Sequence, residues 1–70
     1  MTRTDLPHPL IGHLVRDIAS GTVGELTGVV REVIPMYRGS CESELAYIRP
    51  EAGGPELAIA VANVEALGPH

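Results

Sequence analysis

Residues 22–34 read Thr-Val-Gly-Glu-Leu-Thr-Gly-Val-Val-Arg-Glu-Val-Ile, and this stretch decides the fold. It is rich in β-branched residues, which favour extended strands, and Gly24 and Gly28 interrupt it four positions apart. Its apolar residues occupy both odd and even positions, which point to opposite faces of a strand. The face that is buried must therefore change along the stretch. We therefore predict one long strand that bends at a β-bulge near Gly28.

The segment before this strand is ambiguous. The apolar residues of Leu10–Ile18 match a helical stripe, and they also match a short strand with alternating faces. Gly12 inside a helix costs about 1 kcal/mol relative to Ala, whereas Pro9 at a first helical position would favour the helix. We favour the strand, and we expect residues 1–9, with their two prolines, to form a flexible N-terminal arm.

The long strand is followed by a stretch with the composition of a loop. Residues 35–43 contain proline, glycine and serine, and they predict a mobile connection of nine residues. Glu44–Arg49 then alternates as a strand that ends at Pro50, with Leu45 and Tyr47 on one of its faces.

The last third predicts a hairpin partner for that strand. Ala52-Gly-Gly-Pro55 supplies a turn, and Glu56–Val61 returns as an alternating antiparallel strand. Asn63–Leu67 predicts either a 3₁₀ turn or a short closing strand. We expect residues 10–67 to form a single small β domain, followed by a C-terminal tail at residues 68–70.

Size and charge restrict the classes of function. The 70 residues allow one domain, which removes only about 60% of its unfolded surface from water, so self-association would add buried area. Five arginines, no lysine and nine acidic residues give a net charge of −4, which argues against broad contact with phosphate backbones. A single cysteine, Cys41, and an N-terminus without an apolar secretion signal lead us to expect a cytoplasmic protein.

No residue pattern predicts catalysis or a cofactor. His13, Asp17 and Ser20 could suggest a hydrolytic trio, but their spacing is commonplace and no strained nucleophile turn accompanies them. The three histidines and Cys41 lack the paired spacing of a metal site, and acidic neighbours suppress a reactive thiolate at Cys41. We therefore expect a protein that is not an enzyme and holds neither a cofactor nor a metal.

Five segments carry a resemblance to known proteins: Gly12-His-Leu-Val-Arg-Asp17, Gly21-Thr-Val-Gly-Glu-Leu-Thr-Gly-Val-Val30, Leu45-Ala-Tyr-Ile-Arg-Pro50, Gly53-Gly54 and Ala62-Asn-Val-Glu65. Together they resemble a group of short, uncharacterised actinobacterial proteins, which implies a compact β domain and no particular chemistry. The order of elements is also similar to SH3-like and KOW-type small barrels. This resemblance implies a mainly β fold, a small SH3-like barrel of about five strands, with a short N-terminal helix or 3₁₀ turn as the alternative for the first element.

Four residues are candidates for partner binding: Tyr37, Arg38, Tyr47 and Arg49. They are the residue types enriched at the centres of protein interfaces, and the two tyrosines are the only aromatic residues of the chain. If Tyr37 folds over the strand that carries Tyr47, the two rings could line a shallow groove. The sequence therefore favours a non-enzymatic module, accessory or regulatory, that binds a protein or a second copy of itself.

An edge strand offers a second route to self-association. Residues 56–62 are apolar after Glu56, so this strand would invite a partner strand if it lies at an edge of the sheet. The alternative function is a KOW-like module associated with nucleic acid or the ribosome. That alternative requires Arg16, Arg31, Arg38 and Arg49 to share one face, although KOW loops are usually more basic than this one.

Overall fold

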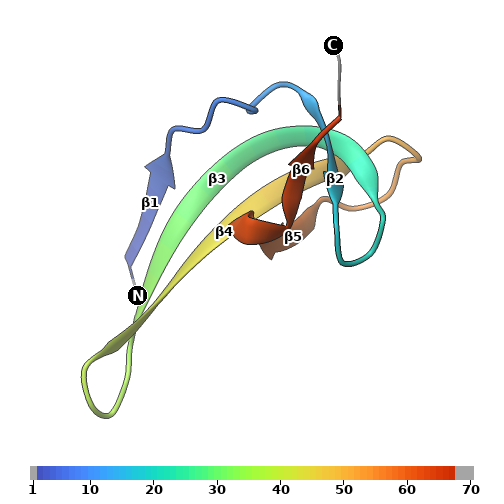
Figure 1. The fold of residues 1–70 in the computed structure, drawn as a ribbon. Coiled ribbons are helices and arrows are strands. Elements are labelled where there is room, and N and C mark those ends of the chain that lie inside the picture. The colour runs from blue at the N-terminus through green and yellow to red at the C-terminus, as the bar shows by residue number, and fades with distance from the viewer. Residues whose placement is uncertain (1, 68–70) are drawn as a thin grey trace.

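The computed structural model describes residues 2–67 as one antiparallel sheet of six strands (Figure 1). The strands are β1 (Thr2–Leu6), β2 (Leu14–Asp17), β3 (Val23–Pro35), β4 (Ser40–Pro50), β5 (Leu57–Ala60) and β6 (Val64–Ala66), with the 3₁₀ turn η1 (Val61–Asn63) before β6. The mainly β fold is thus as predicted, with six strands rather than about five. Residues 2–67 contain no helix that is long and apolar enough to cross a membrane.

The sheet is strongly curled. Its strands run in the order β5-β4-β3-β2-β6, so β5 and β6 end the order, yet only Val61–Asn63 joins them. In a flat sheet four strand spacings, about 19 Å, would separate β5 from β6. The four peptide units from Ala60 to Val64 span at most about 15 Å, so the sheet must bend to bring its ends together. Figure 1 shows this bend as the long arch of β3 and β4.

A β-bulge in β3 produces the change of face that the sequence predicts. Leu26 pairs with Ile48 and Gly28 pairs with Tyr47, so Thr27 is an extra residue in the ladder. The extra residue lets Leu26 and Val29 point to the same side although they are three positions apart. The predicted bulge near Gly28 is therefore confirmed.

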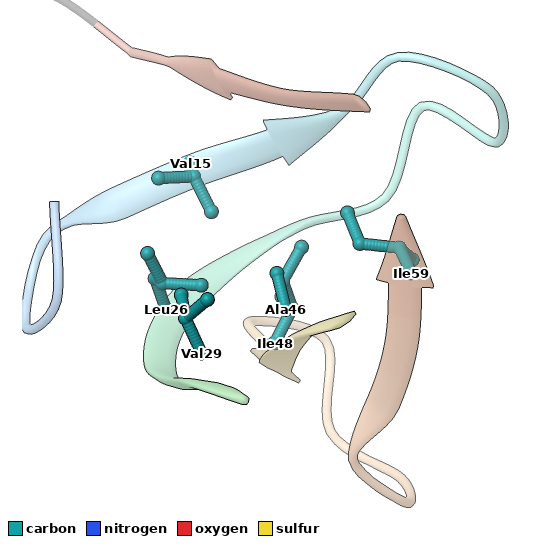
Figure 2. Close-up of a cluster of buried hydrophobic side chains, with 6 residues drawn as sticks. All are labelled: Val15, Leu26, Val29, Ala46, Ile48 and Ile59. Carbon is teal, nitrogen blue, oxygen red and sulfur yellow. The ribbon is translucent and has the colours of Figure 1, made fainter. Parts of the chain in front are cut away.

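The core lies on the inner side of this curled sheet. Six buried side chains from β2, β3, β4 and β5 point toward one another (Figure 2). They are Val15, Leu26, Val29, Ala46, Ile48 and Ile59. They include no aromatic ring, so aliphatic packing of strands on both sides of the bulge stabilises the fold.

The beginning of the chain differs from the prediction. Thr2–Leu6 form β1, which pairs with β3 from Val29 to Val33, so the prediction of an arm is wrong for these residues. Pro7 restricts only Leu6 to extended backbone, and pairing with the open edge of β3 holds the rest of the strand extended. The strand that we favoured within Leu10–Ile18 forms at Leu14–Asp17, preceded by turns instead of a helix.

The predicted nine-residue loop is also wrong. The ladder between β3 and β4 continues to Pro35 and Ser40, so only Met36–Gly39 form the turn. Before Leu45, β4 pairs with β3 alone and lies beyond the core. Because no core side chains cover it there, this part of β4 can carry the polar residues that suggest a loop in the sequence.

The rest of the chain follows the prediction closely. β5 pairs antiparallel with β4, with Ile59 buried and Leu57 half-buried. Of the two alternatives for Asn63–Leu67, the closing strand forms, as β6, which pairs with β2, and the 3₁₀ turn η1 lies before it and shares only Asn63 with that range. Met1 and the predicted tail at residues 68–70 lie outside the described residues.

We expect Gly24→Ala to destabilise the protein by about 2–3 kcal/mol, because an added Cβ would overpack the core side of the sheet. That atom would collide with the carbonyl oxygen of Arg49 and lie 2.7 Å from Cγ2 of Ile48. Gly28→Ala is the matched control, since a Cβ there meets nothing within 4 Å. Urea unfolding measures both free energies, and equal losses for the two variants would contradict this explanation.

Candidate functional site

Of the large apolar side chains in residues 2–67, that of Tyr37 is the most exposed, and it lies with two other exposed ones at the end of the β3–β4 hairpin; Leu14 and Ile18, 46% and 57% exposed, lie apart from it in and after β2. Tyr37 is 97% exposed, Met36 is 57% exposed and Ile34 is 39% exposed. Arg38 is exposed beside them. We call these four residues the hairpin tip, and Figure 1 shows that the turn which carries it projects away from the rest of the sheet.

A tight turn holds the hairpin tip in place. The backbone N–H of Met36 donates a hydrogen bond of 3.0 Å to the carbonyl oxygen of Gly39. Gly39 has φ = +85°, a conformation that residues with a Cβ rarely adopt. Because the paired strands extend directly to this turn, Tyr37 and Arg38 have a defined place at its apex.

The structure does not bring the four predicted site residues together. Tyr37 and Arg38 lie at the hairpin tip, whereas Tyr47 lies seven residues along β4 from Ser40, about 23 Å at the rise of an extended strand. Tyr47 and Arg49 share a face of β4 and are close to each other. The condition for a groove between the two tyrosines is therefore not met.

Tyr47 belongs instead to a small cluster on the outer face of the sheet. Its ring lies 5.1 Å from the guanidinium carbon of Arg3, a cation–π contact between β4 and β1. Between these two strands Val30 is only 3% exposed, although it points away from the core, opposite to Val29. Val30 pairs with Asp5 and with Leu45, so β1 and β4 together cover it. Tyr47 thus has a structural contact that the sequence did not reveal.

Three arginines form ion pairs with glutamates on neighbouring strands. Arg16 contacts Glu65, Arg49 contacts Glu25, and Arg31 lies 3.3 Å from Glu44 and 3.9 Å from Glu42. These exposed pairs contribute under about 1 kcal/mol each. Three of the five arginines therefore face acidic side chains of a neighbouring strand.

The arginines also do not share a single face. Arg31 bonds Glu44, which lies on the same side of β4 as the core residue Ala46. Arg49 lies at an odd position of this regular strand and therefore points to the opposite side. The nucleic-acid alternative requires its four arginines on one face, and in the described sheet Arg31 and Arg49 lie on opposite faces.

Asp17 and Ser20 have a structural role in the turn between β2 and β3. Asp17 is buried, and its carboxylate accepts hydrogen bonds from the Ser20 hydroxyl at 2.6 Å and from the backbone N–H of Ala19 at 3.2 Å. His13 precedes β2 at its other end, about 13 Å away at the rise of a strand. The three residues of the hypothetical hydrolytic trio therefore do not meet.

The described surface has no other concentration of reactive groups. Cys41 is exposed on β4, opposite Ile34. Within residues 2–67 no three His, Cys, Asp or Glu side chains come together in a way that could hold a metal ion. The same residues form no pocket, so the candidate site is the exposed surface of the hairpin tip.

Sequence reasoning missed two contributors to these surfaces. Arg3 falls in the predicted arm, and the signal for its place on one face of a strand is its odd position in an extended segment. Ile34 was treated as part of the bent strand, but its place next to the turn leaves it partly exposed. The places of Arg3 and Ile34 on the surface are both set by the length of β3 beyond the core.

The contact between Arg3 and Tyr47 should couple the two side chains by about 0.5–1 kcal/mol. A double-mutant cycle with Arg3→Ala and Tyr47→Leu measures this coupling in the free energy of unfolding. Arg38→Ala combined with Tyr47→Leu is the control, because Arg38 lies at the distant hairpin tip, and its coupling should be zero. A coupling of the same size in both cycles would contradict the contact.

The exposed hairpin tip, the outer cluster around Tyr47 and the three cross-strand ion pairs define the surface of the chain. Comparison with protein-family models, with curated proteins and with solved structures finds no match for this chain.

Proposed function

We propose that this chain is a non-enzymatic protein-interaction module, with an accessory or regulatory role, that contacts its partner through the hairpin tip. The observation that carries the proposal is the 97% exposure of Tyr37 at the apex of a projecting hairpin. Tyrosine and arginine are enriched in the few interface residues that dominate binding energy. Met36 and Ile34 enlarge the apolar area beside Tyr37 and Arg38.

Folding does not explain these apolar side chains. The core residues lie near the bulge and on β5, and the tip lies beyond them along β3 and β4. An exposed tyrosine at that distance contributes almost nothing to the free energy of unfolding, whereas a partner that covers it would gain buried apolar area. A protein surface is therefore the partner that we favour, and a second copy of this chain is included.

We further propose that the curled sheet is an SH3-like small barrel that presents this hairpin. The support is the strand order, in which β6 returns to pair with β2 after the short turn η1, so that the two ends of the sheet approach each other. A closed or nearly closed sheet leaves few free edges and gives a hairpin a rigid base. We place the module in the reducing cytoplasm, which its single exposed Cys41 supports.

Photocrosslinking tests this function. A photoreactive benzophenone side chain replaces Tyr37 in one variant and Glu51, which is exposed in the turn after β4, in a matched control. In an extract of the producing cells, or in the purified protein at high concentration, the variant at position 37 should give a discrete protein adduct that the control lacks. Identical adducts from both positions, or none from either, would overturn the proposal.

Competition adds a quantitative prediction. Excess protein without the photoreactive group should suppress the adduct. The Tyr37→Ala variant should need a roughly 30-fold higher concentration for the same suppression, which corresponds to about 2 kcal/mol of binding free energy for a dominant interface residue. Tyr37→Ala should leave the free energy of unfolding within about 0.5 kcal/mol of the original, because the side chain is exposed. Equal competition by both proteins would exclude Tyr37 from the interface.

A further inference from the structure

Strand β1 is the most exposed strand of the sheet. Like β5 and β6 it pairs with one strand alone, and four of its five residues are exposed. The six buried core side chains all come from β2, β3, β4 and β5, and from β1 only Leu6 packs against them. The described core is therefore assembled without β1, which lies along its outer edge (Figure 1).

The edge that β1 covers is a template for a strand. β3 presents one side of Val29–Val33 to β1, and without β1 the peptide groups on that side would be unpaired, beside three valines, while those on the other side stay paired with β4. Such an edge pairs readily with any extended chain that fits it. β1 fits through two side chains, since Leu6 lies opposite Val29 and packs on the core, and Arg3 reaches the Tyr47 ring.

The connection after β1 can act as a hinge. Gly12 donates a backbone hydrogen bond of 2.8 Å to the carbonyl oxygen of Leu26, which fixes the chain just before β2. Leu10 also packs against the core, and its carbonyl oxygen accepts a hydrogen bond of 2.9 Å from the backbone N–H of His13. Residues 7–9 therefore lie between β1 and the anchored chain, and their two prolines favour extended backbone in the residues that precede them. Opening these few residues frees β1 without disturbing β2.

We propose that two copies of this chain exchange β1, so that β1 of each copy fills the β3 edge of the other. The second copy is the occupant that the chemistry favours, because its β1 carries the same leucine and arginine at the same spacing. The exchanged pair repeats the contacts of the single chain and needs no new complementary surface, so protein concentration controls it. The hairpin tip takes no part, so this inference stands apart from the proposed function.

Two single-cysteine versions of the full chain test the exchange. Both carry Cys41→Ser. One also carries Thr4→Cys and the other Arg31→Cys, which occupy exposed positions directly opposite each other in the β1–β3 ladder. Opposed positions of an antiparallel ladder have the separation that a disulfide requires. The two proteins are mixed at high concentration, allowed to exchange, oxidised, and analysed by non-reducing mass spectrometry.

Exchange should give the mixed disulfide between the two versions in on the order of tenfold excess over the proportion that random collision produces. The control mixture carries Glu32→Cys in one copy and Ser43→Cys in the other, which are opposite each other in the β3–β4 hairpin. It should show no excess, because those strands are joined by a four-residue turn and share the core.

Mixed disulfide at the random proportion in both mixtures would overturn the exchange, and so would an equal excess in both, since that would indicate general unfolding. Adding Tyr37→Ala to both versions should leave the excess unchanged. Loss of the excess in that background would contradict the independence of the exchange from the hairpin tip, and the photocrosslinking result would then decide between the two surfaces.

Discussion

The extra residue at Thr27 is the constraint on which the structure depends. In a regular strand Leu26 and Val29 would point to opposite sides, and the bulge turns both toward the core. The bulge is held by the side chain of Thr27, whose hydroxyl contacts the carbonyl oxygen of Tyr47 at 3.2 Å and the carboxylate of Glu56 at 2.6 Å. The same residue thus links β3, β4 and the start of β5.

Beyond the bulge, β3 and β4 continue farther than the core can support them. Past Val29 the described hairpin has no second layer, so its side chains are stabilised by neighbours on the same sheet. On one face of the hairpin Arg31 pairs with the glutamates of β4. On the other face Val30 is buried beneath Arg3 and Tyr47. Both arrangements end before the turn, which leaves Tyr37 and Met36 without an intramolecular role.

Local features of the sequence were sufficient for much of this fold. Glycine spacing and the change of parity predicted the bulge, and regular alternation predicted β5 and its pairing with β4. The length of the β3–β4 hairpin could not be predicted, because Ser40 and its polar neighbours are stabilised by pairing with β3 and not by their own strand propensity. β1 was missed for the same reason, since its partner lies 23 to 31 positions later in the chain.

The candidate site could be predicted only in part, for a related reason. Composition identified Tyr37 and Arg38 as exposed, but the distance from them to Tyr47 is set by the hairpin length, which is a property of long-range pairing. A long strand in a short chain also has more edge than its core elements can cover. β4 covers one side of β3, β2 covers part of the other, and the remaining edge depends on the weakly anchored β1. The proposed exchange of β1 would then follow from the fold itself, because the strand that extends the hairpin also needs a partner along its length.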